Sequence, residues 1–517
     1  MRTIVATLVV CLCALVNLNA QSARVTGQVL DSQHTLIKGC QVVLRNADTA
    51  EEFRTTTTEK GDFQLPPVPP GRYEVDASMA GFATAKLTGL VLELAESKVI
   101  EIQLQPASVH ESVTVSDTPP ELTTDRPDRS VVFDESFVDS IPVNVRNPLQ
   151  LINFSPAVTK GDDGLSGQNS TSESRTNTWR INGAKAATSD IMIDGATDTT
   201  SYYNQAAGIP GIEAVQEFRI YTSAYAPEFG HTSGGDVSYA LRSGSNAYHG
   251  ALFEYLRNSD LDSAGFNANK AGQPIGTFRR NQYGGTLGGP VRIPKLYDGK
   301  DKTFFFISYD GLLDSSEGSF TGTMPTALER TGNFSQTTDS NGNLIVMYDP
   351  STTKLNTAVS GTQYIRTPFP GNIIPANEIN PIATKLLSYY PSPNQAGVGK
   401  SSTDNFFSNA PGTDNNERGD VRLDQRLTDK QLIYAHMDYF SNKILQNNYY
   451  GNHLAEVNSN DQIPGFNVMV HHTWSISPSL VFDQHFSWAH SESDRTEPSQ
   501  LTATDLGLPA SVAPGLT

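Results

Sequence analysis

Few residues in this sequence could carry out covalent or metal chemistry. His471 and His472 are adjacent, but consecutive side chains of a strand face opposite ways, which is poor geometry for chelating a metal. Cys40 is the only cysteine after residue 20, which leaves no disulfide framework and no thiolate metal site. No zinc-peptidase motif, G-x-S-x-G elbow or P-loop occurs in the chain. We therefore expect no catalytic residue, no cofactor and no metal.

The segment ESVTVSD offers backbone hydrogen bonding instead. Val113 and Val115 alternate with hydroxylated neighbours, and the flanking sequence is polar and bounded by prolines. An extended segment of this kind can add a strand to the edge of another protein's sheet, where main-chain hydrogen bonds supply affinity. The alternative is an ordinary linker strand. The candidate partner-binding residues are Glu111, Ser112, Val113, Thr114, Val115, Ser116 and Asp117.

Backbone freedom is concentrated at Gly230, Gly234 and Gly235. A strand-like run from Asp236 to Leu241 follows them, and a Gly/Ser/Asn turn comes next, at residues 243–246. Glycine is needed where the chain turns sharply or where a Cβ would collide with neighbouring backbone. We predict that these glycines form a hinge where the chain leaves a compact module and meets the strands after residue 246. A plain surface hairpin is the alternative.

Length and charge limit the class of protein. A chain of 517 residues is too long for one core, and about three domains are expected. The 37 Lys and Arg against 55 Asp and Glu give a formal charge of −18, which argues against a nucleic-acid partner. Residues 1–20 combine Arg2, an apolar stretch from Ile4 to Val16 and a small-residue end at Ala20. This pattern predicts a cleaved export signal, because the apolar stretch is too short to span a bilayer.

The chain after Asn246 alternates apolar and polar residues in segments of about ten residues, as transmembrane barrel strands do. Between 480 and 488, for example, the apolar side chains lie on one face and the polar side chains on the other. The predicted strands are His249–Arg257, Arg280–Val291, Lys302–Leu312, Gly419–Arg426, Gln431–Ser441, Phe466–Ile476 and Leu480–His490. Long connections, including a very long one at 313–418, alternate with short ones. This alternation favours an outer-membrane barrel over a soluble sandwich.

Two earlier parts of the chain resemble known domains. TEKGDFQLPPVPPGRYEVDASMAGF, within residues 23–106, resembles the carboxypeptidase regulatory-like domain, a transthyretin-like β-sandwich of the carbohydrate-binding-like class. IPVNVRNPLQLINFSPAV, RINGAKAATSDIMIDGATDT and AVQEFRIYTSAYAPEFGHTSGG, within residues 125–240, resemble the α+β plug domain of TonB-dependent receptors of the Oar-like group. The ESVTVSD segment lies in the linker 107–124, between these two domains, and in this position it resembles a TonB box.

The expected fold is mainly β: a sandwich, a plug and the first strands of a transmembrane antiparallel β-barrel at 246–517. Seven strands cannot close around a plug, since plugged transporters use about 22. We therefore predict that the chain is the N-terminal part of a longer protein.

The resemblance implies an outer-membrane receptor that imports an unknown extracellular substrate by energy-coupled plug movement. It also implies two partners, a TonB-type energy-transducing complex and outer-membrane lipid. One alternative is a surface adhesion or carbohydrate-binding protein that the barrel only anchors. A weaker one is a secreted enzyme with the sandwich as an accessory domain.

Overall fold

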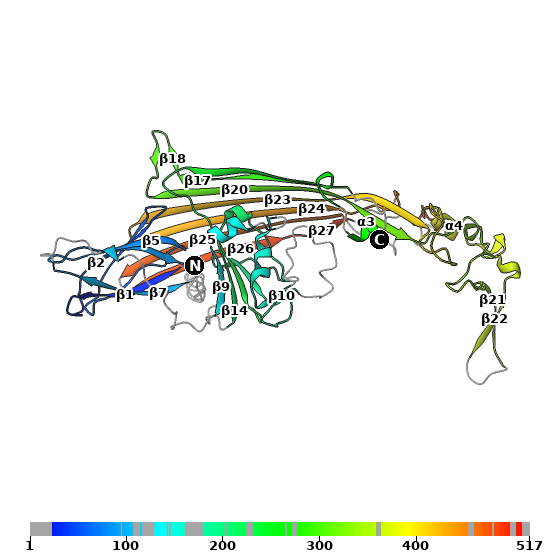
Figure 1. The fold of residues 1–517 in the computed structure, drawn as a ribbon, viewed down its shortest axis with the longest axis horizontal. Coiled ribbons are helices and arrows are strands. Elements are labelled where there is room, and N and C mark those ends of the chain that lie inside the picture. The colour runs from blue at the N-terminus through cyan, green and yellow to red at the C-terminus, as the bar shows by residue number, and fades with distance from the viewer. Residues whose placement is uncertain are drawn as a thin grey trace, which may run out of the picture.

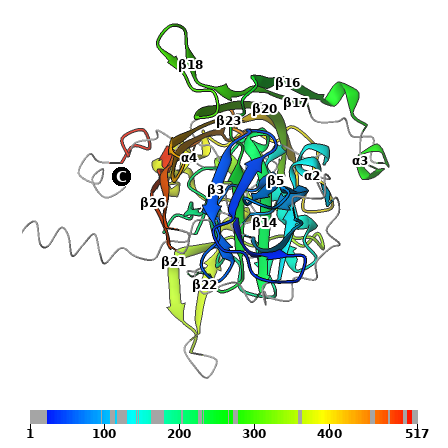
Figure 2. The same ribbon diagram turned by 90° about the vertical axis from the view of Figure 1, so that its left-hand side faces the viewer.

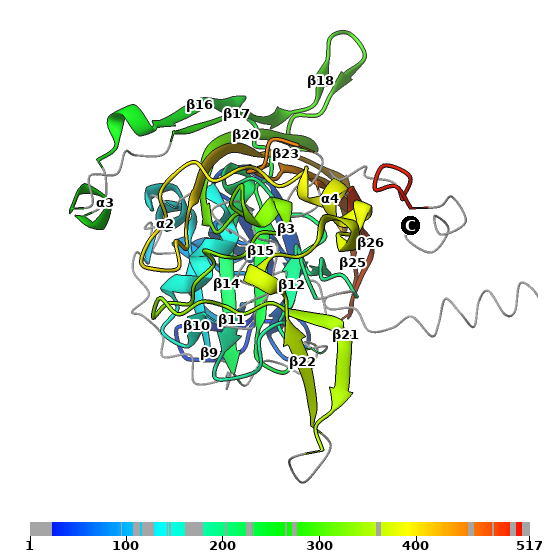
Figure 3. The ribbon, with the colours of Figure 1, turned by 90° about the vertical axis from the view of Figure 1, so that its right-hand side faces the viewer.

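The computed structural model describes residues 23–94, 96–106, 114–115, 129–141, 143, 146–160, 179–201, 204–223, 230, 232–263, 266–270, 277–357, 363–452, 460–477, 480–496 and 503–508. Figure 1 shows a long curved sheet, the wall, with two smaller β modules along one side of it. Figures 2 and 3, which look along the long axis from its two ends, show the wall curving around these modules. The fold is mainly β, as predicted.

The first module, the sandwich, packs two sheets with the strand orders β4-β1-β7 and β3-β2-β5-β6-β8. In β5 and β7 every second side chain points into the core, which holds Tyr73, Val75 and Ile102. The strands are β1 Arg24–Asp31, β2 Gln41–Asn46, β3 Glu52–Thr56, β4 Asp62–Gln64, β5 Gly71–Ser78, β6 Ala85–Leu92, β7 Ser97–Leu104 and β8 Thr114–Val115.

The sequence predicts no strand at β6. The sandwich strands that it predicts are Val25–Leu30, Gln41–Arg45, Phe53–Thr57, Asp62–Leu65, Tyr73–Ala77 and Val99–Leu104. Its period of two is broken: only Leu90 and Leu92 are buried, and the pairing with β5 shifts register between Tyr73 and Val75. Gly89 at φ +79° lies in the irregular part of the strand. Glycine takes this conformation without strain and commonly marks a bulge. A bulged strand that is buried at one end only does not show the alternation on which strand prediction depends.

The second module, the plug, is built on a five-stranded sheet with the order β13-β12-β15-β14-β9. Phe218, Tyr239 and Ile193 fill its core. Its strands are β9 Arg129–Phe133, β10 Val158–Lys160, β11 Trp179–Ile181, β12 Asp190–Ile193, β13 Ala196–Thr197, β14 Val215–Ser223 and β15 Asp236–Leu241, and its helices are α2 Glu135–Ser140, η2 Pro148–Phe154 and η4 Ile212–Ala214.

Local signals in the plug sequence predict tight turns at Asn182-Gly183 and Asp194-Gly195, and a helix that Asn147 caps and Pro148 opens. These predictions are largely confirmed. Asn182-Gly183 and Asp194-Gly195 have positive φ at both residues, as a type I′ turn requires. Asn147 caps the segment that begins at Pro148, and its side chain accepts a hydrogen bond from the N–H of Leu149. That segment is a 3₁₀-helix rather than the predicted ordinary helix.

In the wall the seven predicted strands occur in their predicted order, each antiparallel to the next. They form an open sheet over the described residues, with β16 at one edge. The wall strands are β16 His249–Asn258, β17 Phe278–Pro290, β20 Thr303–Gly322, β23 Phe406–Thr428, β24 Gln431–Leu445, β25 Asn460–Ser477 and β26 Leu480–Ser491, with β27 Asp494–Thr496 pairing to β25.

The wall reverses the usual polarity of a protein. Its convex face carries large apolar side chains that are exposed, among them Leu287, Ile307, Val421, Leu423, Phe486 and Trp488. The concave face carries charged side chains that are almost fully buried, among them Arg280, Asp310, Arg418, Arg422 and Asp438. Such a sheet suits apolar surroundings outside and a polar interior, which is the pattern of a membrane barrel wall.

The connections divide the wall into two ends. The turn end has the short connections 291–302 and 429–430, and the first of these contains the small hairpin of β18 Arg292–Ile293 and β19 Tyr297–Asp298. The loop end has the long ones. It also carries the short helices η5 Ser259–Leu261 and α3 Phe266–Lys270, which follow β16.

The very long predicted loop 313–418 is shorter than expected, because β20 and β23 stay paired up to Gly322 and Phe406. The remaining loop, 323–405, has secondary structure of its own, which Figure 1 shows beyond the loop end of the wall. Its elements are η6 Glu329–Thr331, β21 Tyr348–Leu355, β22 Tyr364–Pro368, η7 Pro370–Asn372, η8 Ala376–Glu378 and α4 Pro381–Leu387. The Arg330 side chain holds it together by donating to the carbonyl oxygens of Pro325, Leu387, Tyr390 and Pro391.

Within the described residues, the helices are all too short or too polar to cross a membrane.

The polarity of the wall predicts the effect of a charge at Val421 on the convex face. Val421→Lys would place an ammonium group in hydrocarbon, and near the bilayer midplane this costs about 2–4 kcal/mol. We expect a lower midpoint of urea unfolding in phospholipid vesicles, whereas Val421→Leu should stay close to the unaltered protein. An unchanged midpoint for the lysine variant would contradict the assignment of this face to lipid.

Candidate functional site

The plug touches the wall through backbone. A Cβ added at Gly465 of β25 would overlap the carbonyl oxygen of Ala207 in the plug, and one added at Gly208 would overlap the Asp438 carboxylate of the wall. The N–H of Gly211 donates to Asp420 of β23 at 3.2 Å. The plug peptide 206–211 therefore lies directly on the wall, and glycines on both sides allow this approach.

The predicted hinge glycines have different surroundings from those we expected. A Cβ at Gly234 would lie 2.8 Å from the Cβ of Ala184, and one at Gly235 would overlap the carbonyl oxygen of Tyr221. Both of these neighbours belong to the plug. An added Cβ at Gly230 meets no atom of the described residues within 4 Å. The pair Gly234-Gly235 thus serves the close packing of β15, the central strand of the plug sheet, rather than an approach to the wall.

The expected collision with the wall occurs instead at Gly244. A Cβ there would overlap the carbonyl oxygen of Phe305 in β20 and lie 2.8 Å from that of Gly289 in β17. The chain leaves the plug for the wall after β15 ends at Leu241, so the predicted position of the crossing was about ten residues too early.

One polar contact between plug and wall centres on Arg422 of β23. Its guanidinium donates to Asp194 at 3.0 Å, to the carbonyl oxygen of Leu241 at 3.0 Å and to Asp424 at 3.0–3.2 Å. Asp194 lies in the tight turn between β12 and β13, and its second oxygen accepts from the N–H of Leu241. His436 Nδ1 lies 3.1 Å from the same Asp194 carboxylate. One plug carboxylate thus joins two neighbouring wall strands.

The charge of Asp194 is stabilised by these partners. Burial alone raises the pKa of this carboxyl, but the Arg422 guanidinium, the hydrogen bond and charge of His436 and the Leu241 N–H together hold its pKa below the usual range. An ionised Asp194 therefore persists although it is fully buried. Removal of one partner from a buried ion pair typically costs 3–5 kcal/mol.

A second polar contact surrounds Asp198 of the plug. Its carboxylate accepts from the N–H of Gly208 at 3.3 Å and from the side-chain amide of Asn467, in β25, at 3.1 Å. The Asp438 carboxylate of β24 packs against Gly208 in the same place. Two buried carboxylates, one from each module, are thus held close together.

The sandwich is attached to the plug by β14. The backbone of Leu94 donates to Glu217 at 2.8 Å and accepts from Arg219, while the Gln216 side chain donates to the carbonyl oxygen of Pro70 at 3.1 Å. Burial raises the pKa of Glu217 to about 8, and the Leu94 N–H and the Arg219 charge only partly oppose it.

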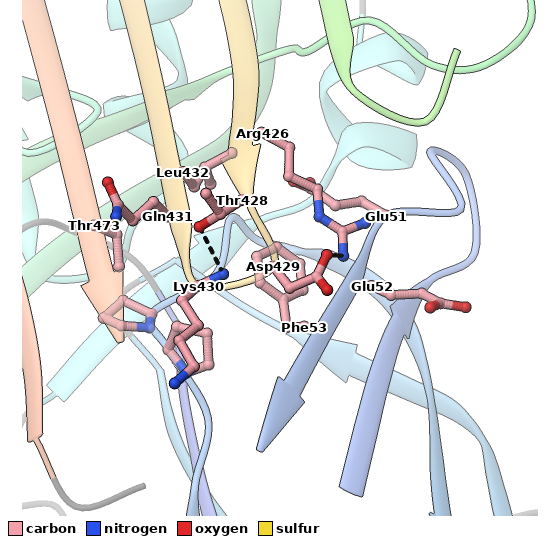
Figure 4. Close-up of a pocket in the computed structure, with 12 residues that line it drawn as sticks. Glu51, Glu52, Phe53, Arg426, Thr428, Asp429, Lys430, Gln431, Leu432 and Thr473 are labelled. Atoms are coloured by element: carbon pink, nitrogen blue, oxygen red, sulfur yellow. Dashed lines mark hydrogen bonds and ion pairs between the residues drawn. The ribbon is translucent and has the colours of Figure 1, made fainter. Parts of the chain in front are cut away.

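The sandwich also meets the turn end of the wall. Figure 4 shows a small cavity there, between Glu51 and Phe53 of the sandwich and the turn that joins β23 to β24. Arg426 extends toward Glu51 and is paired with Asp429 at 2.7 Å. Burial, strengthened by the charge of Asp424, raises the pKa of Glu51 to about 7. Leu432 of β24 joins the sandwich core.

Of the candidate partner-binding segment, only Thr114 and Val115 lie within the described residues. They form β8, which pairs in parallel with Lys86 and Leu87 of β6. Glu111, Ser112, Val113, Ser116 and Asp117 lie outside the described residues. The structure therefore places the middle of the segment at an edge of the sandwich.

The two adjacent histidines face opposite sides of β25, as the strand alternation requires. His471 is buried and contacts the hydroxyl of Tyr434 at 2.7 Å and the carboxylate of Asp483. His472 contacts Gln484 at 3.2 Å. No group of three or more potential metal ligands occurs among the described residues.

Sequence reasoning identified the polar face of the wall but not its contacts with the plug. The alternation of Asp420, Arg422 and Asp424 with Val421 and Leu423 carries the signal for the face. Which plug residue meets Arg422 depends on how the plug sits in the wall, and no local pattern encodes that. The run AAGIPG at 206–211 is a detectable signal for close backbone contact that the sequence analysis did not use.

Parts of the chain match two protein families and one known transporter. Residues 240–516 match the family model described as outer membrane beta barrel domain, and residues 24–105 match the carboxypeptidase regulatory-like domain. The TonB-dependent transporter Oar of Myxococcus xanthus is 26% identical over 303 residues, which are 56% of this chain and 27% of that protein. The chain thus spans about a quarter of the length of this relative.

Two solved structures resemble parts of the chain. The outer membrane transporter YddB from Escherichia coli has a TM-score of 0.40 at 11% identity and covers 70% of this chain and 39% of its own. The siderophore receptor PirA from Acinetobacter baumannii has a TM-score of 0.38 at 13% identity, with coverages of 71% and 40%.

The glycine contact at Gly465 predicts a stability change. Gly465→Ala should force the plug away from the wall, because the obstacle is plug backbone, and overpacking of this kind typically costs about 1–3 kcal/mol. Gly419→Ala is the matched control, since its Cβ would meet only one atom, at 3.9 Å. Urea unfolding of both variants tests this, and equal midpoints would show that plug and wall are not in contact at Gly465.

The raised pKa of Glu217 predicts a pH dependence. The folded state holds the proton more tightly than the unfolded state, whose pKa is near 4.5, so the stabilisation is complete below pH 4.5 and is lost as pH rises through about 8. The urea midpoint of the unaltered protein should fall between pH 5 and pH 8. In the Glu217→Gln variant this fall should be smaller. The exposed Glu101→Gln should leave the pH profile unchanged. A Glu217→Gln profile as steep as that of the unaltered protein would contradict the prediction.

Proposed function

Because the chain belongs to the outer membrane beta barrel domain family, we propose that it is part of a TonB-dependent transporter of the outer membrane. In this proposal the wall crosses the membrane, the plug obstructs its interior, and an extracellular substrate is imported when the plug moves. The similarity to the TonB-dependent transporter Oar supports the proposal.

The observation that carries the proposal is the polar contact between plug and wall. Charged and amide side chains of the wall bind the plug at Asp194, Asp198 and Gly211. An intramolecular hydrogen bond to a charged group contributes only about 1.5–3 kcal/mol net, because water replaces the lost partner. Contacts of this kind can be broken as water enters, whereas an apolar seal would resist hydration. Such a contact suits an obstruction that has to move.

The two ends of the wall suggest its orientation. Barrels of the outer membrane keep their short turns on the periplasmic side and their long loops outside. The sandwich contacts the turn at 429–430 and therefore lies on the proposed periplasmic side. The segment 111–117 follows the sandwich directly, so a periplasmic partner can reach it. Its use as a strand that adds to a partner's sheet is the proposed route of energy coupling.

The loop end is the proposed site of substrate contact. The base of the long loop gathers five aromatic side chains within 5.5–6.3 Å of a neighbouring ring, namely Phe320, Tyr390, Phe406, Tyr449 and Tyr450. The loop 323–405 projects beyond them (Figure 1). A substrate bound here would lie above the plug, on the side opposite to the sandwich.

Binding of the periplasmic domain of TonB from the same bacterium tests the proposal without knowledge of the substrate. Deletion of residues 111–117 from the complete protein in detergent should weaken this binding by about tenfold or more, since the main-chain contacts of the added strand are lost. Surface plasmon resonance with immobilised TonB domain is a suitable measurement.

The control is deletion of TPPELTT at 118–124, which removes the same number of linker residues and should leave the affinity unchanged. Equal affinity for both deletion variants would reject the assigned segment. Failure of the unaltered protein to bind would favour the alternative of a surface adhesion protein that the barrel only anchors.

A further inference from the structure

The hairpin of β18 and β19 projects from the wall at its turn end. In Figures 1, 2 and 3 it extends away from the plug, on the convex side of the sheet. It occupies the connection between β17 and β20, where the chain reads VRIPKLYDGKDK. The connection between β23 and β24, at the same end, is much shorter and has the polar tip Thr428-Asp429-Lys430.

The hairpin has a fixed shape. Arg292 pairs with Asp298 through both backbone and side chain, the latter at 3.1 Å, and Ile293 pairs with Tyr297. The N–H of Leu296 donates to the carbonyl oxygen of Ile293 at 3.0 Å, which closes the turn. At its base, the Tyr297 hydroxyl contacts Thr303 at the start of β20. The residues of the tip are therefore presented in one arrangement.

The tip is apolar and exposed. Leu296 is 79% exposed and Ile293 is 47% exposed, with Pro294 between them and the exposed Tyr297 at the base of the tip. An apolar tip held rigidly in water is unfavourable, and exposed apolar clusters of this kind usually mark a contact with membrane or protein. Lys295 adds a positive charge at the same tip.

The position of the hairpin favours lipid as the contact. The convex face from which it projects bears the exposed apolar side chains of the wall, including Leu287 in β17 and Ile307 in β20. The hairpin connects these two strands, so its apolar tip continues the lipid-facing surface at the level of the turns. Tyrosine and lysine are the residues that favour the interface, because one end is apolar and the other contacts water or phosphate.

We propose that the β18–β19 hairpin is an interfacial anchor that inserts Ile293, Pro294 and Leu296 into the periplasmic leaflet of the outer membrane. Lys295 then lies among the anionic phosphates of the phospholipid headgroups. The inference rests on the orientation given under the proposed function. The anchor fixes the depth of this part of the wall, since a rigid apolar tip resists movement into water.

A fluorescent probe at position 296 tests the anchor. Leu296→Cys is made in a variant of the complete protein whose other cysteines, Cys40 among them, are replaced by alanine, and it is labelled with an environment-sensitive dye. The protein is reconstituted in phosphatidylethanolamine–phosphatidylglycerol vesicles with and without nitroxide-bearing lipid. We expect a blue-shifted emission and about threefold or more stronger quenching by the lipid nitroxide than at Asp429→Cys. Asp429 is the matched control because it lies on the polar turn at the same end.

Each other outcome overturns a defined part of the inference. Equal quenching at the two positions, with equal access for aqueous iodide, would mean that the hairpin lies in water. Protection from both quenchers in native membranes but not in vesicles would mean that a protein covers it. Labelling of Leu296→Cys by a membrane-impermeant maleimide in intact cells would show that the turn end faces the cell exterior. This result would reject the proposed orientation and the proposed function, but not the contact of the hairpin with lipid.

Discussion

In hydrocarbon an unpaired backbone N–H or C=O costs several kcal/mol, so the strands from β16 to β26 must satisfy one another along their length. The same surroundings bring the apolar side chains to the convex face and leave the polar ones to the concave face. With Arg418, Arg422 and Asp438 directed inward and buried, the interior can be filled only by something that offers polar partners. The plug does so through Asp194, Asp198 and the backbone of 206–211.

Two strands of the wall are longer than a bilayer requires. About 9–11 residues of a tilted strand suffice to cross a bilayer, but β20 has 20 residues and β23 has 23. The pair continues far beyond the hydrocarbon at the loop end and there carries the structured loop 323–405. At the other end the sandwich contacts the plug through Glu217 and the wall through Leu432, so that the three modules meet at one place.

The elements that could be predicted from the sequence are those whose cause is local. The Asn182-Gly183 turn, the Asn147 cap and the alternation of Leu480 to Trp488 each depend on residues close together in the chain, and each is confirmed. Strand β6 was missed because Gly89 breaks its period. The long loop was overestimated because the outer ends of β20 and β23 are rich in Ser, Asn and Gly and resemble loop sequence.

The candidate site could be predicted only in part, because its contacts join distant segments. Asp194 meets Arg422 across 228 residues, and Gly211 meets Asp420 across 209. The contacts of the glycines could not be predicted for the same reason. Gly234, Gly235 and Gly244 all prevent collisions, but the collision partner, plug or wall, is set by tertiary position and not by the Gly-Gly pattern itself.

The edge position of β9 has a mechanical consequence. This strand follows the linker in the chain. Among the described residues it is held by a hydrogen-bond ladder on one side only, to β14, with a register shift next to Arg129 where the ladder begins. Tension applied through the linker reaches this ladder first and loads its irregular end. Under a steady pull the plug would lose its first strand while β12, β14 and β15 remain paired, so it would yield in steps rather than being withdrawn as a rigid body.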